Sequence, residues 1–104
     1  MIIVSSSSIA GKKIVKTLGL VRGNTIRARN IGKDILAGFK NIIGGEIEEY
    51  TKLMAEAREQ ALDRMVERAE ELGANAVVDV RFSTSYIMGA ASEILAFGTA
   101  VIIE

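Results

Sequence analysis

Two glutamates near the start of a long charged segment, Glu46 and Glu49, are the candidates for holding a cation. Residues three positions apart lie on the same side of a helix, so both carboxylates would point the same way if this segment is helical. Carboxylate oxygens suit hard cations, and a metal held between copies of the chain could use them. Asp79 and Glu93 offer two further carboxylates. The alternative interpretation is that Glu46 and Glu49 complement the helix dipole and face solvent.

Ligands for soft metals are scarce in this chain. It contains no Cys and no His, whereas soft heavy metals prefer thiolate, thioether or imidazole ligands. Met54, Met65 and Met88 supply thioethers, but the first two fall on the apolar face of a predicted helix, where they are expected to pack in the core. The absence of Cys and His also excludes disulfides, catalytic thiols and imidazole bases. We therefore expect no tight site for zinc, copper or cadmium within a single subunit.

Two other stretches carry side chains that bind anions. Ser5–Ser8 could contact a phosphate through their hydroxyls, but the pattern GxxxxGK[ST] is absent and a plain loop is expected. Residues 12–40 contain eight bases and one acid, which would suit weak binding of nucleic acid or another anion. Zero net charge, 5% aromatic residues and the lack of a recognised motif argue against nucleic-acid binding.

An enzyme with an active site between subunits is a further alternative, because paired carboxylates can act as general acid and base. No candidate base or nucleophile stands apart from residues with structural roles. A module that binds or carries a small molecule or metal ion is therefore the preferred interpretation over an enzyme.

The carboxylates Glu46 and Glu49 must be positioned by one long helix, which is predicted over residues 46–72. Acids crowd its first turn, where the dipole favours negative charge, and Gly73 suits a left-handed C-terminal cap. Gly44 and Gly45 before it are expected to hold a backbone bend. Apolar residues recur at steps of three and four and so form one face that can lie against a sheet. These residues are Tyr50, Leu53, Met54, Ala57, Ala61, Met65, Ala69 and Leu72.

The segments before this helix favour strands and one short helix. Met1–Val4 is predicted to be a short strand. Residues 12–29 are rich in β-branched side chains and predict a long strand with a bend or bulge near a glycine, or two shorter strands joined by a tight turn at residues 22–24. A short helix is predicted over residues 33–41.

The segments after the helix predict a C-terminal β-hairpin. Its first strand is expected over residues 76–88, where strict alternation would place Val78 and Val80 on one face and Asp79 on the other. Its second strand is expected over residues 92–104. The chain is thus α+β: a small sheet packed on one long and one short helix, with a helical crossover before the hairpin.

The last strand, residues 92–104, is apolar or small on both faces, and such a strand needs cover on both. Two helices can cover one face of a small sheet, so the other face would meet another subunit. The charge distribution also favours assembly, because residues 46–71 carry a net charge of −5 and the remainder +5, so that acidic and basic surfaces of neighbouring copies could meet. The alternative is that both charged surfaces face solvent. The sequence therefore predicts a homo-oligomer.

Length and hydropathy set the broad class. A chain of 104 residues predicts one domain, residues 1–104, and 49% hydrophobic residues with few aromatics predict an aliphatic core. No signal peptide is recognised, and the longest uncharged apolar-rich run, residues 94–103, is too short to span a membrane. A cytoplasmic protein with no membrane partner is expected.

Four segments resemble the YbjQ-like family of small proteins. They are GLVRGNTIRAR at residues 19–29, GGEIEEYTKLMAEAREQALDRM at 44–65, ELGANAVVDVRFSTS at 71–85 and FGTAV at 97–101. The resemblance implies an α+β subunit assembled as a ring, usually a pentamer, and the label "putative heavy-metal-binding" without a mechanism. The family has no established enzymatic activity that the resemblance could carry over to this chain. Taken together, the predictions describe a homopentameric binding or carrier module with any small-molecule or metal ligand held at subunit boundaries.

Overall fold

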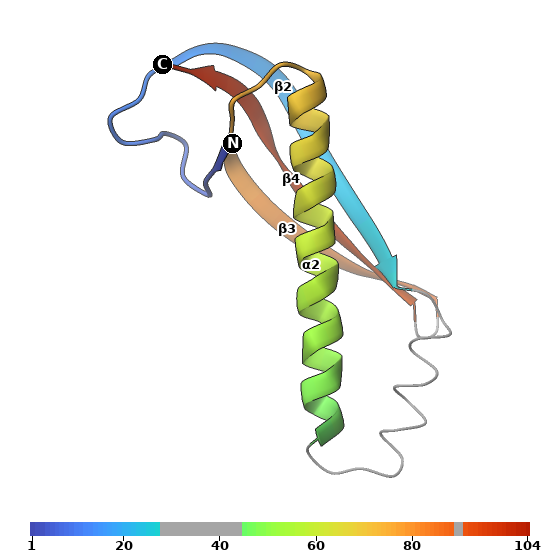
Figure 1. The fold of residues 1–104 in the computed structure, drawn as a ribbon. Coiled ribbons are helices and arrows are strands. Elements are labelled where there is room, and N and C mark those ends of the chain that lie inside the picture. The colour runs from blue at the N-terminus through green and yellow to red at the C-terminus, as the bar shows by residue number, and fades with distance from the viewer. Residues whose placement is uncertain (28–44, 89–90) are drawn as a thin grey trace.

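The computed structural model describes residues 1–27, 45–88 and 91–104, apart from the side chains at positions 27, 45–51, 86–88 and 91. The predicted short helix at 33–41 lies outside these residues. The described chain is α+β, as predicted, with one long helix against a four-stranded sheet (Figure 1). Its elements are β1 (Ile2–Ile3), β2 (Ile14–Arg27), α2 (Gly45–Glu71), β3 (Ala76–Met88) and β4 (Ala91–Ile103).

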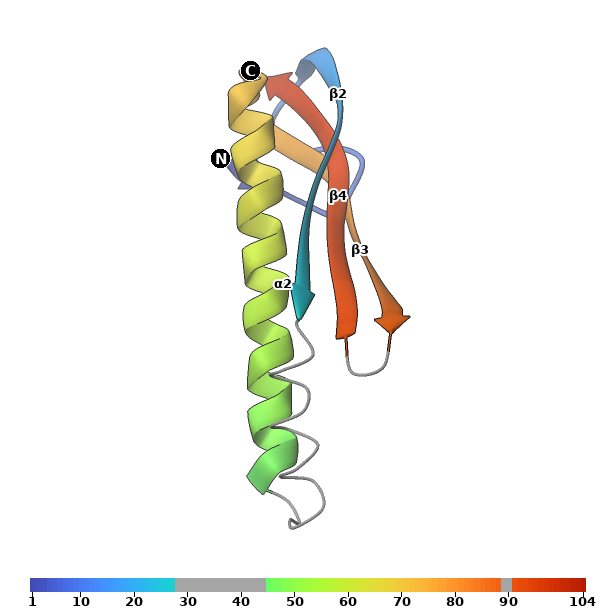
Figure 2. The same ribbon diagram turned by 90° about the vertical axis from the view of Figure 1, so that its right-hand side faces the viewer.

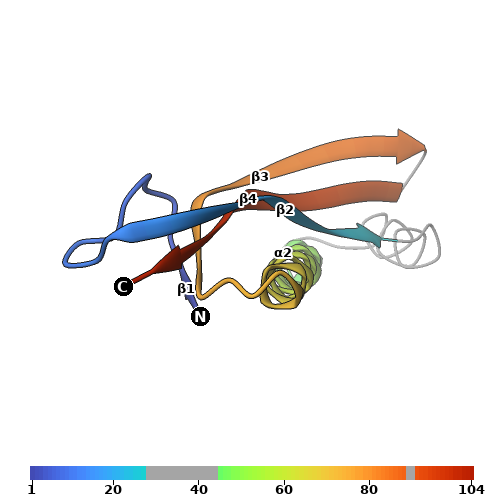
Figure 3. The ribbon, with the colours of Figure 1, turned by 90° about the horizontal axis from the view of Figure 1, so that it is seen from above.

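The sheet has the strand order β1-β3-β4-β2. β3 and β4 form the predicted antiparallel hairpin, β2 pairs antiparallel with β4, and β1 pairs in parallel with β3. The chain crosses from β2 to β3 through α2, which lies on one face of the sheet (Figure 2). Seen from above, α2 lies beside β2 and β4, while β3 runs farther from it (Figure 3). One face of the sheet is therefore covered by α2 only along part of its width.

The long helix ends where the sequence predicts. Gly73 has a left-handed φ of 85° and its amide donates to the carbonyl of Glu70 at 2.9 Å. The amide of Ala74 reaches back to the carbonyl of Ala69 at 3.0 Å, which completes the hydrogen-bond pattern of a glycine-terminated helix. At the other end, Gly45 is the first helical residue, and Gly44 lies outside the described residues.

The main core lies between α2 and the sheet. The predicted helical stripe is fully buried at Ala57, Ala61, Met65 and Ala69. Small residues in this stripe let α2 lie close to β2 and β4, since no long side chain separates the backbones. The prediction that Leu72 belongs to the buried helical face is wrong, because Leu72 follows the last helical residue and is 50% exposed. The sheet contributes Val21, Val77, Ile94, Ala96 and Ala100 to this core.

A second, smaller core lies on the opposite face of the sheet. Val101 and Ile103 of β4 are buried there with Ala76 and Val78 of β3. The N-terminal segment covers them, since Val4 and Ile9 pack against this cluster together with Ile14. The sequence argument that both faces of the last strand need cover is thus correct, but at this end of the sheet the chain covers itself and needs no second subunit.

The predicted alternation along β3 is wrong at Asp79. The pairing with β4 moves from Val78↔Thr99 to Arg81↔Phe97, and Asp79 has a φ of 54°. The extra residue is a β-bulge, which turns the following side chains to the other face. Val78 therefore packs in the second core, whereas Val80 packs against the main core.

The long strand β2 is continuous, as the first of its two interpretations predicted. Register shifts lie between Ile14 and Lys16 and between Thr17 and Gly19, and Gly19 has a φ of 126°. Gly23 pairs with Ala96 inside the strand, so the alternative of a tight turn at residues 22–24 is wrong. The predicted bulge near a glycine is therefore the one at Gly19.

Candidate ligand site at the sheet edge

Of the four predicted metal candidates, the described part of the structure places the side chains of Asp79 and Glu93. Glu46 and Glu49 lie in the first turn of α2, but their side chains are outside the described atoms. Asp79 lies at the bulge of β3, where Ser7 Oγ donates to its Oδ1 at 2.9 Å. Glu93 accepts a hydrogen bond from Asn24 Nδ2 at 3.0 Å. Glu93 pairs with Ser85, six residues beyond Asp79 on β3, so the two carboxylates are roughly 20 Å apart.

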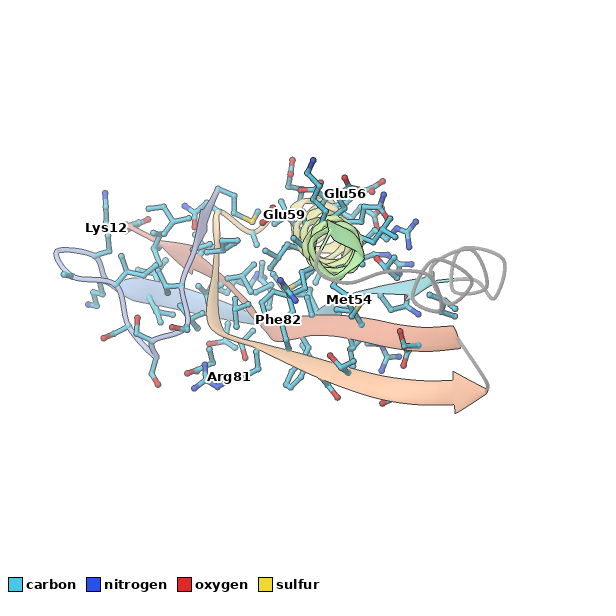
Figure 4. The ribbon with its side chains drawn as sticks, turned by 90° about the horizontal axis from the view of Figure 1, so that it is seen from below. Lys12, Met54, Glu56, Glu59, Arg81 and Phe82 are labelled. Atoms are coloured by element: carbon cyan, nitrogen blue, oxygen red, sulfur yellow. The ribbon has the colours of Figure 1, made fainter. Side chains whose placement is uncertain are left out.

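No group of three or more Asp, Glu, His or Cys side chains that could hold a metal ion occurs among the described residues. Met54 and Met65 have the packing role that was predicted. Met65 is fully buried in the main core, and Met54 packs against it (Figure 4). Both thioethers therefore belong to the interface of α2 with the sheet.

The serine segment is a loop tied to β3. The amide of Asp79 donates to the carbonyl of Ser6 at 2.9 Å, and Arg81 donates through Nη1 to the carbonyl of Ser5 at 2.7 Å. Ser6 Oγ donates to the carbonyl of Ser8 at 2.7 Å. Two of the serine hydroxyls and the Asp79 carboxylate thus bond within the chain. These bonds hold the N-terminal cover of the second core in place.

The sheet has two long edges without a neighbouring strand in the described chain. β2 is the outermost strand on one side. On the other side, β1 pairs only with Ala76 and Val77, and the N-terminal backbone follows β3 only as far as Val80. The face opposite α2 also exposes apolar side chains, with Leu20 66% and Ile26 54% exposed.

Side chains on the two sides of β3 differ in character. Figure 4 shows Phe82 on the side of α2 and Arg81 on the opposite side of the sheet. Phe82 is 45% exposed because α2 covers β2 and β4 rather than β3. Glu56 and Glu59 point away from the sheet on the outer side of α2 (Figure 4).

A pocket of about 790 Å³ opens at the β2 edge. It follows the outer edge of β2: the C-terminal half of α2 lines it from one side of the sheet, and strand residues that alternate with those facing α2 line it from the other. Arg64, Glu67, Arg68 and Glu71 line it at steps of three and four, so they form one stripe of the helix. The remaining lining residues are Arg22, Gly23, Asn24, Glu93 and Leu95.

Hydrogen bonds fix part of this pocket. Arg64 donates through Nη1 to the carbonyl of Asn24 at 2.5 Å, which joins α2 to the edge of the sheet. The Asn24 side chain in turn holds Glu93. A second hollow of about 360 Å³ continues along the edge and shares Arg22, Arg68 and Glu71 with the first. The pocket is therefore a charged groove of both signs beside an open strand.

Sequence reasoning did not find this pocket. The charged helical stripe at 64, 67, 68 and 71 was a signal, because it lies beside the apolar stripe. Its partners on β2 could not be known without the register, which puts Arg22 and Asn24 at the open edge. No helix in the described part of the chain is both long and apolar enough to cross a membrane.

Comparison with known proteins gives the family. A family model described as "Putative heavy-metal-binding" matches residues 1–104. This chain belongs to the YbjQ-like family. A UPF0145 protein of Dehalococcoides mccartyi is 61% identical over 104 residues, covering 100% of both chains. A UPF0145 protein of Methanosarcina acetivorans is 58% identical over 101 residues, covering 97% of this chain and 95% of its own length.

One solved structure shares the fold of this YbjQ-like chain. It is the crystal structure of a protein of unknown function of the DUF74 family from Pediococcus pentosaceus, with a TM-score of 0.67 and 14% identity. The match covers 100% of this chain and 98% of that one. At this identity the similarity concerns the arrangement of helix and strands, and it carries no ligand or activity.

Proposed function

We propose that the chain is the subunit of a cytoplasmic homopentameric ring, which binds or carries a ligand at the boundaries between subunits. The observation that carries this proposal is the pair of open edges, β2 on one side of the sheet and β3 beyond Val80 on the other. Long edge strands present unpaired amides and carbonyls and are commonly paired or covered. A β2 edge that pairs with the β3 edge of the next copy makes a head-to-tail contact, which gives a closed ring where the rotation between copies closes and an open filament where it does not.

The uncovered sheet face supports the same assembly. Leu20 and Ile26 of β2 are more than half exposed. On the neighbouring strand β4, Leu95 and Phe97 are only partly buried. A contact with another copy would cover these apolar side chains together with Arg22 and Asn24, which lie between Leu20 and Ile26 on the same face. The second core already covers the other end of this face, so the contact with another copy would use the end near Ile26.

A binding role follows from the position of the pocket. The groove beside β2 lies at an edge that the next subunit would approach, so a ligand there would contact two copies of the chain. The family description names heavy metals. In this chain a metal would have to be held by carboxylates such as Glu46 and Glu49, because the sequence has no Cys or His.

Native mass spectrometry and light scattering of untagged protein at micromolar concentration test the assembly. We expect about 56 kDa for five chains of 11.2 kDa, with any retained small molecule visible as added mass. The double variant Leu20→Glu with Ile26→Glu should reduce this mass, because it places charge on the exposed apolar face. Glu59→Lys on the outer side of α2 is the control and should leave the mass unchanged. A monomer mass for the parent protein would refute the proposal.

A further inference from the structure

We infer that the pocket at the β2 edge binds a small molecule that carries both an oxyanion and hydrogen-bond donors. This inference rests on the proposed binding role and names the ligand chemistry of that site. The pocket has a volume of about 790 Å³ and is an open groove lined mainly by exposed polar and charged side chains. Its lining comes from β2, β4 and α2, and the pocket extends around the open β2 edge from the α2 side of the sheet to the opposite side.

Three guanidinium groups supply the oxyanion recognition. Arg22 comes from β2, and Arg64 and Arg68 come from consecutive turns of α2. Guanidinium groups bind carboxylate and phosphate oxygens in a bidentate manner. In the described part of the chain, the hydrogen bonds of this pocket are Arg64 to the carbonyl of Asn24 and Asn24 to Glu93. Arg22 and Arg68 thus keep their donors for a ligand.

Three carboxylates in the lining require hydrogen-bond donors on the ligand. Glu67 and Glu71 alternate with the arginines on α2, and Glu93 is held by Asn24 on the opposite wall. A bare anion would be repelled by these groups, since like charges in a partly closed site disfavour one another. Hydroxyl or ammonium groups on the ligand would instead donate to them. The mixed lining therefore selects a molecule with both kinds of group over a simple anion.

Gly23 and Leu95 provide the uncharged part of the lining. A side chain on Gly23 would collide with α2, so the strand and the helix stay in close contact there. This contact holds Arg22 on β2 near Arg64 and Arg68 on α2. The packing of the fold thus fixes the backbone positions from which the three arginine side chains extend.

Calorimetric titration at low ionic strength tests the inference with three probes. Sulfate is an oxyanion without donors at neutral pH, glutamate combines carboxylates with an ammonium group, and glucose 6-phosphate combines a phosphate with hydroxyls. We expect at least one of the last two to bind tenfold or more tightly than sulfate, and the tighter one identifies the anion as carboxylate or phosphate. Equal or absent binding of all three probes would overturn the inference.

Matched variants locate the site. Arg22→Gln with Arg68→Gln should weaken the tighter probe by at least tenfold, because charge-assisted hydrogen bonds are lost. Arg58→Gln with Lys12→Gln removes the same charge outside the pocket and should leave affinity unchanged. Glu67→Gln with Glu71→Gln should tighten sulfate binding and reduce the preference over it. Unchanged affinity in the arginine variant would contradict the site.

Native mass spectrometry of the same samples separates this inference from the proposed ring. If the parent protein is pentameric but none of the three probes binds, the ligand site is refuted while the ring stands. If the parent protein is a monomer but the probes bind and respond to the variants as described, the ring is refuted while the ligand site stands. Each result therefore decides one of the two proposals.

Discussion

The backbones of α2 and β2 lie in close contact at Gly23, and adding one methyl group there should destabilise the protein. A Cβ at Gly23 would lie closer than 3.0 Å to the backbone nitrogen of Met65 and the backbone oxygen of Ala61, and 2.7 Å from Cβ of Arg64. Backbone atoms cannot rotate away as a flexible side chain can. The methyl group therefore has to push α2 and β2 apart along the main core.

The size of the effect follows from two opposing contributions. Overpacking a filled core costs about 1–3 kcal/mol, and the contact with backbone atoms places Gly23→Ala near the upper end. Replacing glycine also restricts the unfolded chain, which offsets roughly 0.4–1 kcal/mol. The net loss should be about 2 kcal/mol, which is roughly 8–16 °C in melting temperature for a domain of this size.

Thermal unfolding followed by circular dichroism at fixed protein concentration measures this loss, because assembly makes the melting temperature depend on concentration. Gly19→Ala is the control on the same strand. A Cβ there would contact nothing within 4 Å, so only the positive φ of 126° opposes it. We expect Gly23→Ala to be the more destabilising of the two. A melting temperature within 1 °C of the parent would refute the close contact between β2 and α2.

Three further predictions concern single substitutions, and a fourth concerns metal binding. Ala100→Asp buries an unpaired carboxylate at a fully buried position and should lower stability by several kcal/mol, measured by denaturant unfolding. Gly73→Ala should cost about 1 kcal/mol in the same assay, because Gly73 caps α2 in a left-handed conformation. Thr25→Val should leave the melting temperature unchanged or raise it, since Thr25 Oγ1 is buried with no hydrogen-bond partner in the described chain. Calorimetric titration with zinc should give at most weak binding. The affinity should decrease as the pH is lowered and should be lost in Glu46→Gln or Glu49→Gln. A nanomolar site in each chain would contradict this prediction.

The elements of this fold were predictable because their signals are local. The spacing of Ala57, Ala61, Met65 and Ala69 gives the helix and its buried face, and Gly73 gives its end. The strands β2, β3 and β4 follow from composition and glycine placement. Each of these signals acts within a few residues of the chain, so no knowledge of the tertiary structure is needed to interpret them.

The errors arose where one residue changes the relation between distant segments. The bulge at Asp79 moves Val78 and Val80 to opposite faces, and nothing in the alternating sequence around Asp79 distinguishes a bulge from a regular strand. The N-terminal segment covers Val101 and Ile103, which depends on the parallel pairing of β1 with β3. The candidate site was missed for the same reason, because Arg22 and Arg64 line the same pocket only as a result of the tertiary contact between β2 and α2 at Gly23.

Stability and the proposed ligand site therefore depend on the same contact. Gly23 lets β2 lie against α2, and the same approach sets how far Arg22 stands from Arg64 and Arg68 across the pocket. A larger residue at position 23 would widen that separation as well as weaken the core. The three arginines would then be less well placed to contact one ligand, even in the fraction of molecules that remains folded. Gly23→Ala should thus weaken binding of the preferred probe at a temperature where circular dichroism shows the variant fully folded, while Gly19→Ala should not.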